Sequence, residues 1–508
     1  AHALGCVVSA EAIAPTMVSD GLLHYKHTDL PMGEFWLNSP THDKPNDMRD
    51  AISGAHIYGK KIIQSESFTS VRMNWGEHPG NLKVVGDRNF ALGINKMVMH
   101  VFTHNPWLNK KPGMTLDGVG LYFQRDQTWF KQSKAWIEYL TRCQSLLQMG
   151  DPVVDVAVFT GEEIPRRSIL PDRLVSTLPG IFGKEKVEAE KKRLENKDQP
   201  LRQIPDGVNH SANMADPEDW IDPLNGYTYD SFNPDALMMM QVKNGRVVLP
   251  GGASYGVLVI PGKMLMNPNP TMSVAVQKKL QQLANAGAKM VVDQQWMKLF
   301  GNKKNVVAAP YMESSFEKLG VKRDVTIEDN DEHAIAWTHR TTKDAEIYFL
   351  SNQSNITQNF KIKFRVGQYD HVEYWNPVTG EILDWSFLGG GQSFAIGMGS
   401  GDSYFLVFRK ATETKANEMN RFYRFIKLQL LKKGMIAELN YNLEQKPEQF
   451  NTANKITEPI ITIRKMTAND LQFLNTEKYD IFRRIFFLRH YLKKMDLFTE
   501  TGTYKYLY

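Results

Sequence analysis

The stretch KKIIQSESFTS (residues 60–70) is a short apolar run that closes on one carboxylate, Glu66, among hydroxyl side chains. A helix is predicted just before it, capped by Asn46 and ended by Gly59. The apolar residues of this helix recur at i, i+3, i+4 and i+7, as on one buried helix face: Met48, Ala51, Ile52 and Ala55. A helix followed directly by a strand predicts an α/β unit that builds a parallel sheet.

The same alternation continues on both sides of this unit. Helices are predicted around residues 81–93 and after a cap at Thr128, with strands at 96–104 and 153–159. A (β/α)8 barrel needs roughly 250 residues, which is more than this pattern spans. We therefore expect residues 1–150 to form the C-terminal part of a (β/α)8 TIM-like catalytic barrel.

Three further units are predicted beyond this partial barrel. Residues 151–305 read as a small doubly wound α/β domain of the flavodoxin or glutamine-amidotransferase kind. Residues 306–410 alternate as short strands between turns, which is typical of a β-sandwich. Residues 411–508 contain no tryptophan and are expected to be a basic, mainly helical tail of unknown role. The predicted fold class is α/β plus β.

Composition excludes several classes of protein. The net charge of +5 comes from the tail, which carries 17 Lys+Arg against 11 Asp+Glu, so the body offers no basic surface for nucleic acid. No apolar run is long enough to span a bilayer, and the N-terminal residues lack the pattern of a signal peptide. Cys6 and Cys143 are the only cysteines, and both are expected to be buried thiols rather than a disulfide pair.

Three acids stand where short apolar runs end: Glu11 in VVSAEA, Glu34 in LPMGEFW and Glu66 in QSES. In a parallel α/β barrel the chemistry gathers at the C-terminal ends of the strands, which makes these acids catalytic candidates. The alternative is that they cap helices or pair with an arginine such as Arg125. The cluster GEEIPRR (161–167) is expected to hold solvent-exposed ion pairs.

These acids belong to motifs that resemble the α-L-rhamnosidases of glycoside hydrolase family 106. The resemblance runs from about residue 7 to residue 408 and is carried, in order, by LPMGEFW, AISGAHIYGKKIIQSESFTS, HPGNLK, DRNFALGINKMVMHVFTHNPW, KPGMT, FQRDQTWF, YLTRCQSLLQMGDPVVDVAVFTGEEIP and EYWNPVTGEI. The resemblance implies a large, multidomain, calcium-dependent inverting glycosidase with a catalytic (β/α)8 barrel, acting on rhamnose-containing oligo- or polysaccharides in the periplasm or outside the cell.

The resemblance also implies roles for single residues. Glu66 falls on one of the two catalytic carboxylates, and Glu34 falls where the family places a calcium-binding acid. The family's second catalytic carboxylate lies farther upstream than this chain reaches, so we expect a fragment that is inactive alone. An inverting pair of acids is held roughly 6.5–9.5 Å apart. Whether Glu66 is the acid or the base stays open. An apolar neighbour such as Trp107 or Phe68 would raise the pKa of Glu66 and favour the acid role, whereas Arg125 nearby would lower that pKa and favour the base role.

Substrate binding is assigned to polar residues near the predicted strand ends and to aromatic rings that can stack on a sugar. The residues are Glu11, Trp36, His104, Trp107 and Arg125. His100 lies four residues before His104, and of the two His104 is predicted to lie nearer the mouth of the barrel. A zinc pair is disfavoured because the two histidines fall on a strand and not on a helix.

Two alternatives remain at this point. One is a retaining β-galactosidase-type barrel in which Glu11 and Glu66 lie roughly 5–5.5 Å apart. The other is a non-catalytic carbohydrate-binding or assembly protein, which would bind rhamnosides without turnover.

Overall fold

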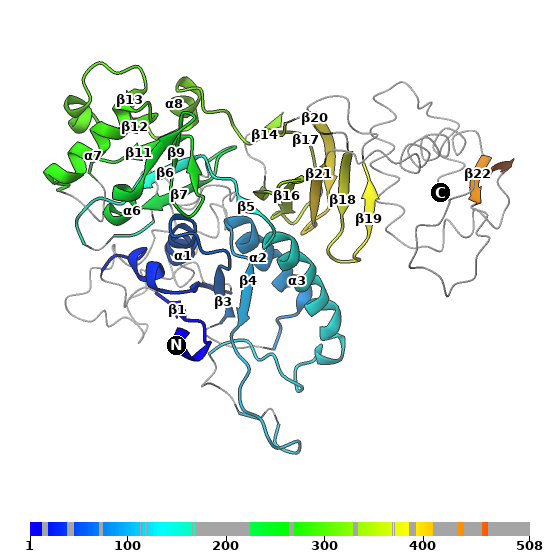
Figure 1. The fold of residues 1–508 in the computed structure, drawn as a ribbon. Coiled ribbons are helices and arrows are strands. Elements are labelled where there is room, and N and C mark those ends of the chain that lie inside the picture. Colours follow the sequence, from blue (N-terminus) through cyan, green and yellow to red (C-terminus); the bar gives the residue numbers. More distant parts are fainter. Residues whose placement is uncertain are drawn as a thin grey trace.

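The computed structural model describes residues 1–12, 19–37, 45–70, 75–168, 224–263, 269–328, 334–385, 393–409, 435–440 and 460–465, except for isolated positions within them (112, 115, 117, 118, 165, 368 and 370). Three units lie together in Figure 1: an N-terminal α/β unit in blue and cyan, a second α/β unit in green, and a β-sandwich in yellow. None of the described helices is long and apolar enough to cross a membrane.

The N-terminal unit is a four-stranded, fully parallel sheet in the order β1-β2-β3-β4. Its strands are β1 (Ser9–Glu11), β2 (Leu30–Trp36), β3 (Gln64–Thr69) and β4 (Lys96–Met99). Its helices are α1 (Pro45–Ile57), α2 (Pro79–Leu92) and α3 (Ser133–Leu147), with short 3₁₀ turns at His2–Leu4, Leu23–His27 and Phe130–Gln132. The predicted strand–helix alternation is confirmed. The described strands form an open sheet and no closed barrel.

Helix α1 buries the apolar face that its spacing predicts, since Met48, Ala51, Ile52 and Ala55 are all at most 1% exposed. It lies directly on β2, where a Cβ on Gly33 would come within 2.9 Å of the Asp47 carbonyl oxygen. Glycine at position 33 therefore lets the helix seat against the strand that carries Glu34. The three helices and the strands share one core, which continues into the sandwich through Phe349.

Three local predictions in this unit are wrong. Asn46 lies inside the first turn of α1 and is not its cap, because the helix already begins at Pro45. Thr128 does not cap the third helix, since a 3₁₀ turn intervenes and α3 begins at Ser133. Cys6 is exposed, because the residues around it form a surface turn and not a strand. Cys143 is buried on α3, as predicted.

The second unit is a five-stranded parallel sheet in the order β13-β12-β11-β6-β7, the arrangement of a doubly wound domain. It extends to residue 318, past the predicted boundary at residue 305. The strands are β6 (Val156–Phe159), β7 (Tyr229–Phe232), β11 (Val257–Ile260), β12 (Met290–Val292) and β13 (Val306–Ala308). Around them lie α6 (Pro234–Met239), α7 (Val274–Asn285), α8 (Glu313–Lys318), a 3₁₀ turn at Gln294–Leu299, and a small antiparallel sheet of β8 (Gln241–Lys243), β9 (Arg246–Val248) and β10 (Ser254–Tyr255).

The third unit is a pair of antiparallel sheets that enclose an aromatic core, which agrees with a sandwich. One sheet holds β14 (Val325–Glu328), β17 (Gln358–Phe364) and β20 (Ser393–Met398). The other holds β19 (Ile382–Asp384), β18 (His371–Trp375), β21 (Ser403–Arg409), β16 (Ala345–Asn352), β15 (Ile335–Thr341) and the two-residue β5 (Asp151–Pro152). Beyond it, the tail is described only at β22 (Met435–Asn440) and β23 (Ile460–Lys465), an antiparallel pair and not helices. The rest of the predicted helical tail lies outside the described residues.

A buried ion cluster on β15 makes the stability of the sandwich depend on pH. His339 Nδ1 lies 2.7 Å from Asp324 and Nε2 lies 2.9 Å from Glu346. Burial alone would lower the pKa of His339, but these carboxylates outweigh it and raise that pKa above its ordinary value. Burial would also raise the pKa of Asp324, yet His339 outweighs it and lowers that pKa.

The directions of these two pKa shifts define the pH range in which the sandwich is most stable. The His339 contribution is complete below the unfolded pKa of about 6.5 and is lost as pH rises through its higher folded pKa. The Asp324 contribution is present above about pH 3.9 and is lost as pH falls through its lower folded pKa. We expect urea unfolding to show highest stability between these limits and a decline above pH 6.5. In His339→Gln that decline should disappear, and an unchanged slope would contradict this assignment.

Candidate functional site

The register of the first sheet brings the three strand-end acids together. Glu34 and Glu66 are direct partners across β2 and β3, so their side chains project from the same face. Glu11 pairs with Met32, two residues before Glu34, and therefore projects from that face as well. One carboxylate oxygen from each of the three acids lies within 4.8 Å of the other two. We call Glu11, Glu34 and Glu66 the acid cluster.

Burial within the acid cluster is graded. Glu34 on the inner strand is 2% exposed, and the Glu66 side chain is 23% exposed. Glu11, on the edge strand, is half-buried. The cluster thus has a buried floor at Glu34 and opens toward solvent on one side, as a site that receives a ligand must.

The position of Glu66 is fixed by a neighbour that the sequence did not single out. Thr69 Oγ1 donates a hydrogen bond to Glu66 Oε1 at 2.6 Å. The register between β2 and β3 shifts between Glu34 and Trp36, and Phe68 has a positive φ of 69°. A phenylalanine rarely adopts that conformation, because its Cβ crowds the backbone. This local twist accompanies the approach of Thr69 to the carboxylate.

The same twist places Phe68 away from the acids. Its ring packs edge-on to Phe35 at 4.9 Å between centroids, and Phe35 neighbours Glu34 on β2 and so projects from the opposite face. Phe68 also contacts Trp136 of α3. The expectation that Phe68 forms an apolar wall beside Glu66 is therefore wrong.

A histidine adjoins the acid cluster from the next strand. Glu66 pairs with Val98 on β4, and His100 lies two residues farther along. The His100 amide donates to Ser67, and its Nδ1 lies 3.9 Å from Glu66 Oε1. That Nδ1 is buried and has no hydrogen-bond partner in the part of the chain that the structure describes. The sequence favoured His104, yet His100 is the histidine beside Glu66.

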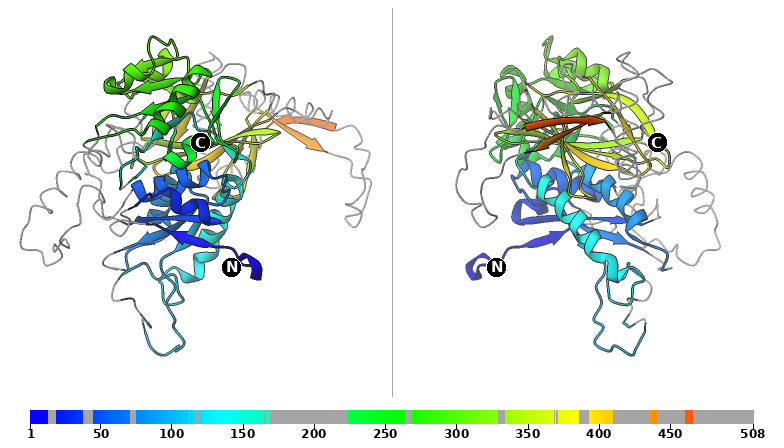
Figure 2. Two further views of the ribbon diagram at one scale, coloured as in Figure 1. Left: turned by 60° about the vertical axis from the view of Figure 1, so that its left-hand side comes forward. Right: turned by 90° about the vertical axis from the view of Figure 1, so that its right-hand side faces the viewer.

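The other predicted binding residues lie at differing distances from the acids. Trp36 is half-buried at the end of β2, opposite Thr69 in the register. His104 and Trp107 are exposed on the segment after β4, which extends away from the sheet in Figures 1 and 2. Arg125 donates to the carbonyl oxygens of Asn105 and Trp107, so it braces this segment. The proposed pairing of Arg125 with Glu66 has no support in these contacts.

The GEEIPRR cluster is not the solvent-exposed group that was expected. The Arg167 side chain is 0% exposed and forms ion pairs with Asp47 and Asp50 of α1. Since α1 lies against β2, this buried cluster ties the segment after β6 to the helix that backs Glu34.

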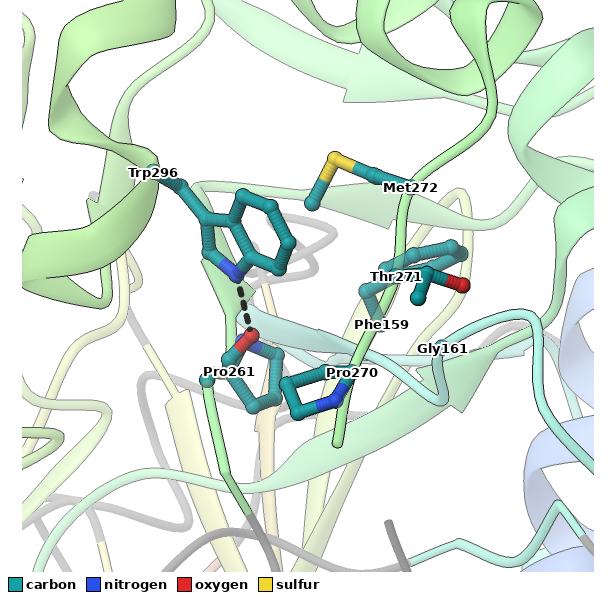
Figure 3. A pocket seen from close by; sticks show the side chains of 8 residues that line it. Phe159, Gly161, Pro261, Pro270, Thr271, Met272 and Trp296 are labelled. Carbon is teal, nitrogen blue, oxygen red and sulfur yellow. Dashed lines mark hydrogen bonds between the residues drawn. The ribbon is translucent and has the colours of Figure 1, made fainter. Parts of the chain in front are cut away.

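A second hollow lies between the ends of β6 and β11, where the strand order of the doubly wound sheet reverses. Figure 3 shows the lining, in which Trp296 donates to the Pro261 carbonyl oxygen at 2.8 Å beside Phe159 and Met272. Such switch points often hold ligands. This one offers only about 10 Å³ to water-sized spheres, which is too little for a sugar ring. The acid cluster is the stronger candidate site.

Comparisons with known proteins identify the family to which the chain belongs. The sequence model of glycoside hydrolase family 106, described as alpha-L-rhamnosidase, matches residues 2–220 and 206–388. The structure resembles a rhamnosidase from Novosphingobium sp. PP1Y, with 25% identity, a TM-score of 0.63, and coverage of 81% of this chain and 38% of that one.

A protein of Formosa agariphila, provisionally named a beta-glucuronidase, is 30% identical over 416 residues, which are 76% of this chain and 30% of that protein. The chain thus spans about a third of the length of these two relatives.

Proposed function

The chain belongs to glycoside hydrolase family 106, the alpha-L-rhamnosidases, and on this premise we propose that it serves in a glycosidase that removes terminal L-rhamnose from glycans. The observation that carries the proposal is the acid cluster, because three carboxylates from neighbouring parallel strands meet on one face of the sheet. Action outside the cytoplasm is part of the same proposal and rests on the family resemblance alone.

The acid cluster fits a calcium ion by its chemistry. Calcium takes 6–8 oxygen ligands, and carboxylates are its usual protein donors. Three carboxylates this close repel one another, and a bound cation relieves that repulsion. We propose that Glu34, with Glu11 beside it, holds the ion, which supplies fixed coordination of sugar hydroxyls when bound. The fit rests on the donor set.

Glu66 is the proposed proton-transfer group of the cluster. Glu66 combines partial exposure with a hydrogen bond from Thr69 to Oε1, and we propose that its other carboxylate oxygen meets a water or the glycosidic oxygen. An oxygen that accepts a hydrogen bond suits a base that takes a proton from water. His100, 3.9 Å away, faces the same oxygen and helps to orient it.

The second proton-transfer group is proposed to lie outside the acid cluster. An inverting mechanism holds its two carboxyl groups roughly 6.5–9.5 Å apart, and the nearest oxygens of Glu11, Glu34 and Glu66 are within 4.8 Å. Hence no pair within the cluster has the spacing of inversion.

That close spacing favours one alternative mechanism, in which Glu11 and Glu66 form a retaining pair of carboxyl groups roughly 5–5.5 Å apart. The anomer first released by the enzyme decides between the two. Proton NMR during early hydrolysis of an aryl α-L-rhamnoside should show β-L-rhamnose first, and α-L-rhamnose first would instead support the retaining pair.

Specificity is tested by a panel of aryl glycosides. We expect the enzyme containing this chain to release phenol from the α-L-rhamnoside and to leave the β-D-glucuronide intact. Hydrolysis of the glucuronide alone would replace rhamnose by the sugar that the Formosa relative's name suggests. Saturable binding of rhamnosides without turnover of either substrate would favour a non-catalytic carbohydrate-binding protein.

Removal of the cation is expected to abolish activity. A chelator should reduce turnover at least 100-fold because the sugar hydroxyls lose a fixed partner, and added Ca²⁺ should restore it. Glu34→Gln should weaken Ca²⁺ binding by calorimetry about 10- to 100-fold, whereas Glu138→Gln on the exposed face of α3 should leave it unchanged. Full activity in chelator would refute the calcium proposal.

A further inference from the structure

The structure holds a polar cavity at the junction of all three units, and none of the acid-cluster residues lines it. It is bounded by α1, by β7 of the second sheet and by β15 of the sandwich. The cavity offers about 20 Å³ to water-sized spheres, which is room for one species of water to halide size. The charged side chains among its lining residues are Arg49, Asp230 and Arg340, together with His56.

Arg49 reaches this cavity with most of its hydrogen-bonding capacity unused. Its Nη1 donates to the Leu92 carbonyl oxygen, and its guanidinium stacks on Tyr229 at 4.3 Å from the ring centroid. Its Nε and Nη2 are buried and have no hydrogen-bond partner among the described residues. The side chain is 2% exposed, so bulk water does not solvate it. Leaving such donors unpaired in a buried charged group is costly.

The carboxylate that lines the cavity, Asp230, already accepts hydrogen bonds from other side chains. Asp230 accepts from His56 Nδ1 at 2.9 Å and from the Tyr255 hydroxyl at 3.0 Å, and it lies 3.8 Å from Arg49 Nη2. His56 Nε2 is buried and has no hydrogen-bond partner in the described part of the chain.

Arg340 gives two donors to the carbonyl oxygens of Met149 and Gly150, and burial lowers its pKa to about 10. Two arginines and one carboxylate thus line the cavity, and Asp151, which is not among the lining residues, also acts on Arg340.

We propose that this junction cavity binds one small monovalent anion of the halide class, held by Arg49 Nε and Nη2 against His56. An anion accepts the two unused donors of the Arg49 guanidinium in charge-assisted hydrogen bonds, which are stronger than those that a neutral water molecule would accept. Because the lining comes from three units, the anion stabilises their mutual arrangement. Each unit supplies lining residues that the other two lack, so the site exists only in the assembled fold.

Bromide is the probe for this site, because it replaces chloride and scatters X-rays anomalously. We expect crystals of the wild-type protein soaked in sodium bromide to show an anomalous peak within hydrogen-bonding distance of Arg49 Nη2 and near His56. A water-like density there without anomalous signal, at bromide concentrations that label surface sites, would overturn the proposal.

Stability in solution gives an independent readout. At constant ionic strength, replacing sodium gluconate by sodium chloride should raise the unfolding midpoint saturably by about 2–4 °C. The rise should vanish in Arg49→Gln and persist in Arg142→Gln, an arginine on α3 with a side chain 36% exposed. If Arg49→Gln does not fold, His56→Gln takes its place. A chloride response equal in all variants, or absent from wild type, counts against the site.

Discussion

Replacing Glu66 by glutamine is expected to lower kcat for an aryl α-L-rhamnoside by about 10²–10⁴-fold, the usual contribution of one proton-transfer group. Glutamine keeps the size of the side chain and can still accept the hydrogen bond from Thr69, so the sheet should fold as before. It can neither take up nor release a proton at the reacting oxygen. Substrate binding should therefore persist while the chemical step is lost.

The readout is kcat and KM measured on the enzyme containing this chain, with circular dichroism to verify folding. Glu138→Gln on α3 is the matched control, since this glutamate is exposed and pairs with Lys134 and Arg142 on its own helix. Rescue of Glu66→Gln by azide, with a rhamnosyl azide as product, would indicate that a nucleophile that needs no general base replaces the water that Glu66 activates. Undiminished turnover by the variant would remove Glu66 from the mechanism, whatever the fate of the calcium proposal.

The convergence of the three acids was predictable because a parallel sheet has simple geometry. Neighbouring parallel strands run in the same direction, so residues that close successive apolar runs come to one side of the sheet. Only β1 ends at its acid, since β2 and β3 continue to Trp36 and Thr69. Glu11, Glu34 and Glu66 each close such a run, so their meeting follows from strand parity and register. The open question from sequence was only whether neighbouring strands share that register, and the pairing of Glu34 with Glu66 answers it.

The surroundings of Glu66 were less predictable, because they depend on backbone detail. A strict alternation along β3 would put Phe68 on the same face as Glu66, and the positive φ at Phe68 breaks that alternation. The residue type does not predict this positive φ, since a phenylalanine seldom adopts such a backbone conformation. The sequence also favoured His104 over His100, whereas the structure places His100 beside Glu66, because β4 ends at Met99, earlier than the apolar run suggested.

Ion pairs between residues far apart in the sequence are a further feature that sequence patterns do not reveal. GEEIPRR looks like a surface cluster because arginines and glutamates alternate with turn residues. The partners of Arg167 lie 117 and 120 positions earlier, in a helix whose polar residues look solvated when only one apolar face is considered. Burial of α1 on more than one side, by β2 and by the second unit, could be seen only from the assembled fold.

Replacing Arg167 by methionine should therefore destabilise the fold by about 3–5 kcal/mol, the usual cost of removing one partner from a buried charge cluster. Asp47 and Asp50 would both lose their ion pair with Arg167, and both side chains are 0% exposed. Burial already raises the pKa of Asp50 above its ordinary value, even with Arg167 opposing that effect. Methionine fills much of the volume, so the loss reports the charge and not a cavity.

Urea unfolding followed by circular dichroism measures this loss, with Arg323→Met as the control. Arg323 pairs with Glu317 at 2.7 Å on a partly exposed surface, where removing an ion pair costs about 0–1 kcal/mol. The triple change Arg167→Met, Asp47→Leu and Asp50→Leu should recover much of the stability, because apolar groups of similar volume often replace a buried ion cluster without loss. If Arg167→Met costs no more than Arg323→Met, α1 is not held to the second unit through these charges, and the anchoring of the strand that carries Glu34 must come from packing alone.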